Sequence, residues 1–235
     1  MRAIFLSLLT SILFMNFNTK ESPASLHYLV KHPQTENNKT PLIILLHGIG
    51  SNEKDLFSFA DQLPEKFLVI SARAPYEMGK DSYAWYEADF SKPKPIFNKE
   101  QAEKSRNTII KFIEELKTKY TFDDKQVYLS GFSQGAIMAY SAGLTQPDKI
   151  KGIAVMSGRL LEEVKPLIIS TENLKQLNVF ITHGTEDNVL GIHFAQESNA
   201  YLKQLGINAV YKEYPEGHTI SKDMLSDLIN WLNKI

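Results

Sequence analysis

One short stretch of the chain places a serine where it could act as a nucleophile. The run Gly131-Phe132-Ser133-Gln134-Gly135 follows an apolar segment that starts at Val127 and precedes a series of helix-forming residues. A serine hydroxyl is a weak nucleophile, so it has to be exposed, held rigidly and placed beside a base. A sharp strand-to-helix turn with flanking glycines meets these needs, because the glycines let the chain cross closely at the turn. The pattern therefore predicts acyl-transfer chemistry at Ser133.

A base and its orienting carboxylate are expected later in the chain, each on a loop after a later strand. The stretch from His183 to Asn188 follows one apolar run, and His218 lies in a short loop after another. Of the six histidines, only His193 and His218 follow this acidic stretch, and no strand-like run separates His193 from it. We therefore predict His218 as the general base and Asp187 as the carboxylate that orients it, with Glu186 as the alternative acid.

A second donor for the developing oxyanion is expected from the loop after an early strand. The apolar run from Pro41 to Leu46 leads into His47-Gly48-Ile49-Gly50-Ser51-Asn52. The backbone N–H groups of Ile49 and Gln134 are the predicted oxyanion hole, and the helix after Ser133 adds the positive end of its dipole. The alternative is a glycine turn that only joins a strand to a helix. His47 is expected to brace this loop by hydrogen bonding.

These residues need a sheet to hold them at one edge, and the rest of the chain predicts one. Short apolar runs alternate with stretches of helical period, a pattern typical of crossover units and a mainly parallel sheet flanked by helices. Helical stripes appear at Ile109, Ile113 and Leu116 and again from Met224 to Leu232. The predicted strands are Leu26–Val30, Leu42–Leu46, Phe67–Ser71, Val127–Ser130, Ile150–Met156, Val179–Thr182 and Ala209–Tyr214.

The segment from Ala74 to Asn98 has no sustained period of either kind, and prolines and a glycine interrupt it. Loops of this length are uncommon in compact domains and are often functional. We expect an irregular loop that forms an apolar wall of the substrate site, or one whose rings simply cover the edge of the sheet. The rings belong to Tyr76, Tyr83, Trp85, Tyr86, Phe90 and Phe97.

The composition sets limits on the function. Lys and Arg number 26 and Asp and Glu 27, so the net charge of -1 provides no global field to gather nucleic acid or anionic lipid. Cysteine is absent, which excludes disulfides, thiolate nucleophiles and sulfur-ligated metal sites. With 43% hydrophobic residues, the 235-residue chain has enough apolar material for one core, and residues 25–235 are predicted to form a single domain.

The first residues differ from the rest. After Arg2 comes an apolar run from Ala3 to Met15, followed by a polar stretch. This pattern is typical of a secretory signal peptide and is short for a membrane-spanning helix, although the Ser22-Pro23-Ala24 cleavage site is weak. Residues 1–24 therefore predict secretion or a periplasmic location, with no membrane span in the mature chain. A retained membrane anchor and a cytoplasmic start are the alternatives.

Six stretches, in their order and spacing, together resemble the phospholipase/carboxylesterase family, a group of small α/β-hydrolases that includes the acyl-protein thioesterases. They are LLHGIGSNEKDL, ISARAP, YAWYEADF, LSGFSQGAIMAY, ITHGTEDNV and YPEGHTIS. The resemblance covers nearly the whole chain after about residue 26. It implies an α/β-hydrolase fold without a large cap, acting without a cofactor or metal on carboxylic esters and sometimes on thioesters or lysophospholipids.

The resemblance also assigns residues. Ser133, Asp187 and His218 fall on the catalytic triad of the family, Ile49 and Gln134 on its oxyanion donors, and Trp85 on a tryptophan near its acyl site. Two departures favour the bacterial-type esterase branch over the thioesterase branch. Ser51 stands where thioesterases usually carry an aspartate, and YAWYEADF replaces their W-F-D pattern.

The predicted function is therefore a serine esterase that acts on a small-molecule ester or a lipid-like substrate. Two other classes stay open on the sequence: a serine peptidase on the same fold, which would use the same triad, and a catalytically silent binding protein. The sequence also leaves a homodimer open.

Overall fold

The computed structural model describes residues 24–89, 91 and 96–235. The core of the molecule is a seven-stranded sheet, with the strands in the order β1-β3-β2-β8-β9-β10-β11. All neighbouring pairs are parallel except β1 with β3. The mainly parallel sheet predicted from the sequence is confirmed. Its strands are β1 Tyr28–Lys31, β2 Leu42–Leu46, β3 Leu68–Ala72, β8 Val127–Phe132, β9 Gly152–Met156, β10 Asn178–Gly184 and β11 Val210–Tyr214.

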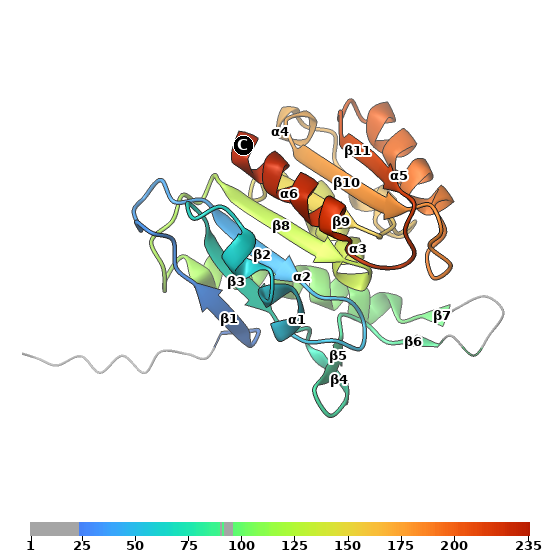
Figure 1. The fold of residues 1–235 in the computed structure, drawn as a ribbon, viewed down its shortest axis with the longest axis horizontal. Coiled ribbons are helices and arrows are strands. Elements are labelled where there is room, and N and C mark those ends of the chain that lie inside the picture. The colour runs from blue at the N-terminus through green and yellow to red at the C-terminus, as the bar shows by residue number, and fades with distance from the viewer. Residues whose placement is uncertain (1–23, 90, 92–95) are drawn as a thin grey trace, which may run out of the picture.

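Helices cover both faces of this sheet (Figure 1). The helices α1 and α6 pack on one face, and α2, α3 and α5 pack on the other. The long helices are α2 Lys99–Leu116, α3 Gln134–Thr145, α5 His193–Gln204 and α6 Lys222–Lys234. The short helical segments are α1 Lys54–Phe57, η1 Ala60–Gln62, η2 Lys165–Leu167 and α4 Glu172–Lys175.

The alternation of side chains along β2 divides the core into two halves. Every residue of this strand is buried, as expected for a strand covered on both faces. Leu42, Ile44 and Leu46 pack against the cluster that α2, α3 and α5 complete, whereas Ile43 and Leu45 pack against the cluster of α1 and α6. Full burial of such side chains contributes ~1.5–3 kcal/mol each. The two clusters fix the sheet edge at which the functional loops emerge.

The predicted helical stripes lie in the core. Ile109, Ile113 and Leu116 of α2 are buried, as are Met224 and Leu228 of α6. Both helices begin at a side-chain cap, which satisfies a backbone N–H of the first turn. The cap of α2 is Asn98, whose side chain accepts from the N–H of Gln101, and the cap of α6 is Ser221, which accepts from the N–H of Met224.

The aromatic segment is more regular than the sequence predicts. It contains two small hairpins, β4 Tyr76–Gly79 with β5 Ser82–Ala84, and β6 Ala88–Asp89 with β7 Ile96–Phe97. The expectation of an irregular loop was therefore wrong for these residues. Strands of two to four residues are too short to show a period of two, which is why the pattern escaped detection. Asp81, with φ of 56°, forms the turn of the first hairpin.

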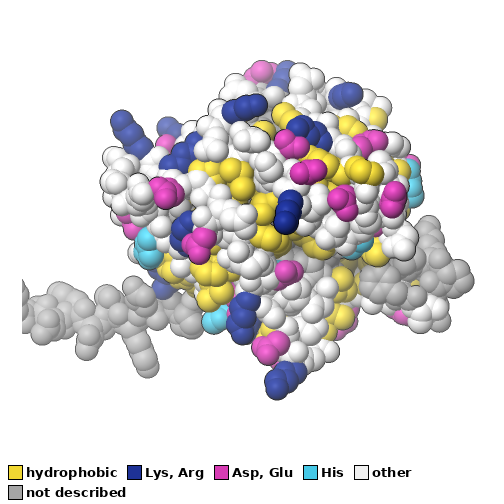
Figure 2. Space-filling model, in the orientation of Figure 1, with side chains coloured by type: hydrophobic (Ala, Val, Ile, Leu, Met, Phe, Trp, Pro, Cys, Tyr) yellow, Lys and Arg dark blue, Asp and Glu magenta, His cyan; other side chains and the backbone are white. Residues whose placement is uncertain are grey.

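Lys and Arg side chains alternate with Asp and Glu over the face seen in Figure 2, with hydrophobic side chains between them. This mixture agrees with the net charge of -1. The predicted signal peptide at residues 1–24 and the ring of Phe90 lie outside the described residues, apart from Ala24. None of the described helices combines the length and the hydropathy that a membrane crossing requires.

Candidate active site

Ser133 lies at a strained turn between β8 and α3. Its φ of 52° and ψ of -117° put a non-glycine residue in a region that L-residues rarely adopt. Such a conformation costs ~1–3 kcal/mol and persists only where the surroundings enforce it. Here the Ser133 N–H donates to the carbonyl of Met156 at the end of β9, over 3.0 Å. The strain turns the side chain out of the strand at the carboxyl edge of the sheet.

Two glycines make this turn sterically feasible. A Cβ atom at Gly131 would lie 2.3 Å from the carbonyl carbon of Gly135. A Cβ atom at Gly135 would lie 1.9 Å from the carbonyl oxygen of Leu46, at the end of β2. No larger residue fits at either position without moving backbone. The spacing of the two glycines around Ser133 is therefore a packing requirement as well as a motif.

The structure brings Ser133, His218 and Asp187 together in one chain of hydrogen bonds. The Oγ atom of Ser133 lies 2.9 Å from Nε2 of His218, and Nδ1 of His218 lies 2.7 Å from Oδ2 of Asp187. The Asp187 carboxylate can only accept, so Nδ1 carries a proton and Nε2 is left to accept from the hydroxyl. The side chain of Asp187 is fully buried and that of His218 is 16% exposed. Such an arrangement can transfer a proton from the hydroxyl to the ring.

Asp187 is held in its charged form. Burial by itself would raise the pKa of this carboxyl, but hydrogen bonds from His218 and from the N–H groups of Leu190 and Val189 outweigh burial and lower its pKa. The two N–H groups donate to Oδ1 over 2.8 and 2.9 Å, which leaves Oδ2 for His218. Glu186, the alternative acid, has no contact with His218 among the bonds described.

His183 is a neighbour of this site that the sequence did not single out. Its Nε2 atom lies 3.3 Å from Oδ2 of Asp187 and bonds to the carbonyl of Leu190. The ring is buried, and burial lowers its pKa. A neutral His183 therefore packs beside Asp187 and holds its loop. His193 begins α5, where its ring contacts Phe194.

The loops that carry Asp187 and His218 are joined through their backbones. The N–H of Thr185 donates to the carbonyl of Tyr214 over 2.7 Å, and the N–H of Glu186 donates to that of Glu216 over 3.0 Å. A Cβ atom at Gly184 would lie 2.1 Å from the Glu216 carbonyl oxygen, so only glycine permits this approach. Asp187 and His218 are thus held by pairing of their loops as an extension of the β10–β11 ladder.

The predicted oxyanion donors stand on either side of Ser133. Gln134 follows it at the first turn of α3. The loop of Ile49 lies close, since a Cβ atom at Gly48 would be 3.4 Å from the Cβ of Ser133. Within the described part of the chain, neither the Ile49 N–H nor the Gln134 N–H donates to a protein acceptor. Both are therefore free to bind an oxygen atom of a ligand.

His47 and Trp85 hold the loop of Ile49 in place through hydrogen bonds. Nε2 of His47 accepts from the N–H of Ala74 over 3.0 Å, so its Nδ1 is the protonated atom and donates to the Gly48 carbonyl over 2.7 Å. Burial lowers the pKa of His47, and the ring stays neutral. The indole Nε1 of Trp85 donates to the carbonyl of His47 over 2.9 Å. The bracing predicted for His47 is present.

Trp85, which the resemblance places near the acyl site, is fully buried beside the loop of Ile49. Its side chain has no exposed surface, and its backbone N–H donates to the side chain of Gln134 over 2.7 Å. A fully buried indole cannot contact a substrate in this arrangement. Its role as an acyl-site wall stays a prediction, while its contacts to His47 and Gln134 tie the two oxyanion segments to each other.

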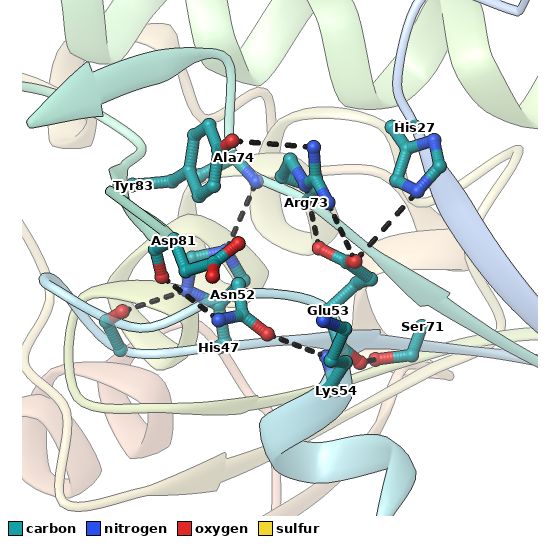
Figure 3. Close-up of polar contacts among 11 residues, drawn as sticks. His27, His47, Asn52, Glu53, Lys54, Ser71, Arg73, Ala74, Asp81 and Tyr83 are labelled. Atoms are coloured by element: carbon teal, nitrogen blue, oxygen red, sulfur yellow. Dashed lines mark hydrogen bonds and ion pairs between the residues drawn. The ribbon is translucent and has the colours of Figure 1, made fainter. Parts of the chain in front are cut away.

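A partly buried ion pair supports the same loop, and sequence reasoning missed it. The carboxylate of Glu53, 1% exposed, accepts from Nε and Nη2 of Arg73 over 2.6 and 2.7 Å (Figure 3). His27 approaches the same carboxylate at 3.6 Å, and Ser71 donates to the Glu53 carbonyl over 2.7 Å (Figure 3). The Arg73 guanidinium lowers the pKa of Glu53 to about 2. The stretches GSNEKDL and ISARAP contained both partners, but charge alone does not reveal pairing.

In the part of the chain that the structure describes, no three His, Cys, Asp or Glu side chains gather as a metal ion would require. The prediction that no cofactor takes part stays a prediction. A cavity of about 850 Å³ is not lined by Ser133, His218 or Asp187. It lies along α2, α3 and α5, and Tyr86, Phe97 and Arg159 are among its walls.

The chain is similar in sequence and fold to known esterases and thioesterases. A family model described as Phospholipase/Carboxylesterase matches residues 29–235. The chain is 26% identical over 217 residues to an acyl-protein thioesterase 1 of Emericella nidulans, covering 83% of this chain and 90% of that protein. A probable carboxylesterase SOBER1-like of Arabidopsis thaliana is 32% identical over 111 residues, which span 47% of this chain and 42% of that one. The crystal structure of esterase PE8 superposes with a TM-score of 0.77 at 26% identity, covering 89% of this chain and 99% of that one.

A mainly parallel sheet between two helical layers, with a serine at the turn after its β8 strand, defines an α/β-hydrolase. The class fits every feature of the fold described above. The chain belongs to the phospholipase/carboxylesterase family. It is a carboxylic ester hydrolase, as the names of its relatives indicate.

Proposed function

We propose that this protein hydrolyses carboxylic esters through an acyl-enzyme on Ser133, with His218 as general base and Asp187 as the group that orients it. The observation that supports the proposal best is the pair of hydrogen bonds linking these three side chains, 2.9 and 2.7 Å long, at a strained turn. The family assignment and the named esterases among its relatives support the same reaction type.

The reaction runs in two steps. Oγ of Ser133 attacks the ester carbonyl while its proton passes to Nε2 of His218, and the alcohol leaves after taking that proton. Water then attacks the acyl-enzyme through the same base and releases the acid. Asp187 remains charged throughout, which fixes the tautomer of His218 and stabilises the imidazolium form.

The oxyanion of each tetrahedral intermediate is proposed to bind the N–H groups of Ile49 and Gln134. Loss of one donor of this kind costs ~2.7–4 kcal/mol of transition-state stabilisation. The N-terminus of α3 adds its dipole at the same point. The bracing of the Ile49 loop by His47, Trp85 and the Glu53–Arg73 pair favours a preorganised hole.

The proposal extends to the organisation of the chain. In this proposal, residues 25–235 form one catalytic domain, and the substrate is a small-molecule or lipid-like ester. The apolar segment at residues 1–24 supports secretion or a periplasmic location. Whether two copies associate is a separate property that this reaction does not need.

The test compares wild type with Ser133→Ala and Asp187→Asn, using p-nitrophenyl esters of graded length and matched peptide p-nitroanilides. Ester hydrolysis and fluorophosphonate labelling should both be lost in Ser133→Ala. Asp187→Asn should lower kcat by a factor on the order of 10⁴, because Asn favours the wrong tautomer of His218. Amide cleavage at a rate comparable to ester cleavage would favour a peptidase. A wild type that neither labels nor turns over esters would favour a binding protein.

A further inference from the structure

The cavity beside α3 has the size of a ligand site. Its volume is about 850 Å³, within the ~300–1,000 Å³ typical of small-molecule pockets. Rings and aliphatic side chains from separate segments form its walls, among them Phe97, Leu161, Val164, Phe194 and Tyr201. An elongated apolar group would therefore gain contact area along these walls.

One cation stands among these apolar walls. The guanidinium carbon of Arg159 lies 4.6 Å from the ring centroid of Phe97 and 5.2 Å from that of Phe194. Contacts of this kind use the faces of the guanidinium and leave its edge of N–H donors available. The Nε donor of Arg159 is buried, and no described acceptor lies within hydrogen-bond distance of it. A buried donor without an acceptor is uncommon and costly, so it requires an explanation.

The other cations of the cavity wall differ from Arg159, because each has a carboxylate partner. Lys99 pairs with Glu163 at 2.5 Å, Arg106 with Glu103 at 2.5 Å, and Lys165 with Glu162 at 2.6 Å. No described carboxylate lies within ion-pair distance of Arg159. The remaining carboxylate of the wall, Glu197, is exposed on α5. Arg159 is therefore the one cation of the described wall without an ion pair, although its charge helps to lower the pKa of nearby Glu163.

The cavity adjoins the Ser133 turn on two sides. A Cβ atom at Gly158 would lie 2.6 Å from the Cβ of Ala136, one turn of helix after Ser133, and Gly158 directly precedes Arg159. On the other side, the carbonyl of Tyr86, a wall residue, accepts from the side chain of Gln134 over 2.7 Å. These contacts place the cavity next to the Ser133 turn, on the side of α3 where Arg159 lies.

We propose that the cavity binds the far end of the substrate and that Arg159 recognises an oxyanion there, so that the preferred substrates are esters with an apolar spacer ending in a carboxylate or a phosphate. The inference rests on the proposed esterase function of Ser133. Guanidinium recognises both groups through paired N–H donors, so the chemistry they share is a compact oxyanion. Of the guanidinium nitrogens of Arg159, only Nε is buried without a partner, so the oxyanion would bind the Nη donors.

Two series of substrates test this proposal and separate the two sources of the charge. In the first, mono-p-nitrophenyl esters of dicarboxylic acids of graded length are compared with neutral p-nitrophenyl esters of equal chain length. In the second, p-nitrophenyl esters of fatty acids whose far end carries a phosphate are compared with neutral p-nitrophenyl esters of equal chain length. Wild type should prefer the charged member in at least one series. Arg159→Gln should lower kcat/KM for that member by about 10- to 100-fold, the range for a hydrogen bond to a charged group, and change the neutral member by less than about threefold.

Three controls keep the outcomes distinct. Arg159→Lys keeps the charge without the planar fork and should retain part of the preference, and it serves if Arg159→Gln does not fold. Lys165→Gln, on the same wall but paired with Glu162, should leave the preference unchanged. The fluorophosphonate labelling rate reports Ser133 independently of the cavity.

The proposal would be overturned if Arg159→Gln lowered kcat/KM equally for the charged and the neutral substrate of a series. It would also be overturned if the wild type preferred the neutral ester in both series. In either case neutral esters would still be hydrolysed, and the esterase proposal would stand. Failure of the wild type to cleave any ester would instead refute the proposed function.

Discussion

The partly buried pair of Glu53 and Arg73 allows a prediction whose magnitude follows from the structure. The pKa of Glu53 falls from 4.5 to about 2, chiefly because Arg73 donates to the carboxylate. At about 1.4 kcal/mol per pKa unit, this shift corresponds to about 3 kcal/mol of folding free energy. The variant Arg73→Met removes the donor and leaves a carboxylate that is 1% exposed without its counter-charge. Such a change costs ~3–5 kcal/mol, in agreement with the value from the pKa.

Urea unfolding of a double-mutant cycle measures this energy. Arg73→Met should lower the free energy of unfolding by about 3–5 kcal/mol, and Glu53→Gln should also be destabilising. The double variant should be no less stable than Arg73→Met alone, because the uncompensated carboxylate is gone. The coupling energy between the two positions should thus be at least as large as the cost of Glu53→Gln alone. If the two changes add to within about 0.5 kcal/mol, the pair does not interact as described.

The sign of the pH dependence follows from the direction of the shift. The folded-state pKa of Glu53 lies below its unfolded value. The contribution of the Glu53 carboxylate to the free energy of unfolding is therefore fully present above pH 4.5 and is lost as the pH falls toward about 2. The free energy of unfolding of the wild type should therefore fall with decreasing pH between 4.5 and about 2. In Glu53→Gln this pH dependence should be weaker. The same variants should lower kcat, because the Glu53 backbone lies on the segment that holds Ile49.

Two further predictions concern the turn and its support. Gly135→Ala should destabilise the protein by about 3 kcal/mol or more in urea unfolding and abolish ester hydrolysis, since its Cβ would lie 1.9 Å from the Leu46 carbonyl oxygen. Gly217→Ala is the matched control, with its nearest neighbour 4.0 Å away, and should change stability by less than about 1 kcal/mol. Trp85→Phe removes the indole donor to the His47 carbonyl and should cost about 1–3 kcal/mol of stability. It should slow hydrolysis equally for all acyl lengths, and a shift in length preference would show that the side chain reaches the substrate.

Much of the sheet could be predicted because apolar runs mark strands covered on both faces. The errors occur at strand ends, where other interactions set the limits. The β10 strand continues past Thr182 through His183 and Gly184, whose backbones pair with β11 although their side chains break the apolar run. The β9 strand begins at Gly152 and not at Ile150, because the Ile150 N–H donates to Gln146 at the end of α3.

The residues of the site also differ in whether the sequence could predict them. Ser133, Asp187 and His218 stand in short loops after recognisable strands, so their order in the chain was enough to select them. Glu53, Arg73 and Arg159 were not selected, because their roles depend on partners far away in sequence. Arg159 acquires its surroundings from Phe97 and Phe194, and no local pattern brings those rings together.

The backbone pairing between the loops of Asp187 and His218 has a consequence for how this enzyme can vary. Since main-chain groups make the joints, many side chains on these loops can be exchanged without disturbing the imidazole. The length of the two loops is constrained instead. Adding or deleting one residue in either loop would break the register of the backbone hydrogen bonds from Thr185 to Tyr214 and from Glu186 to Glu216. The two loops should therefore move as one rigid unit.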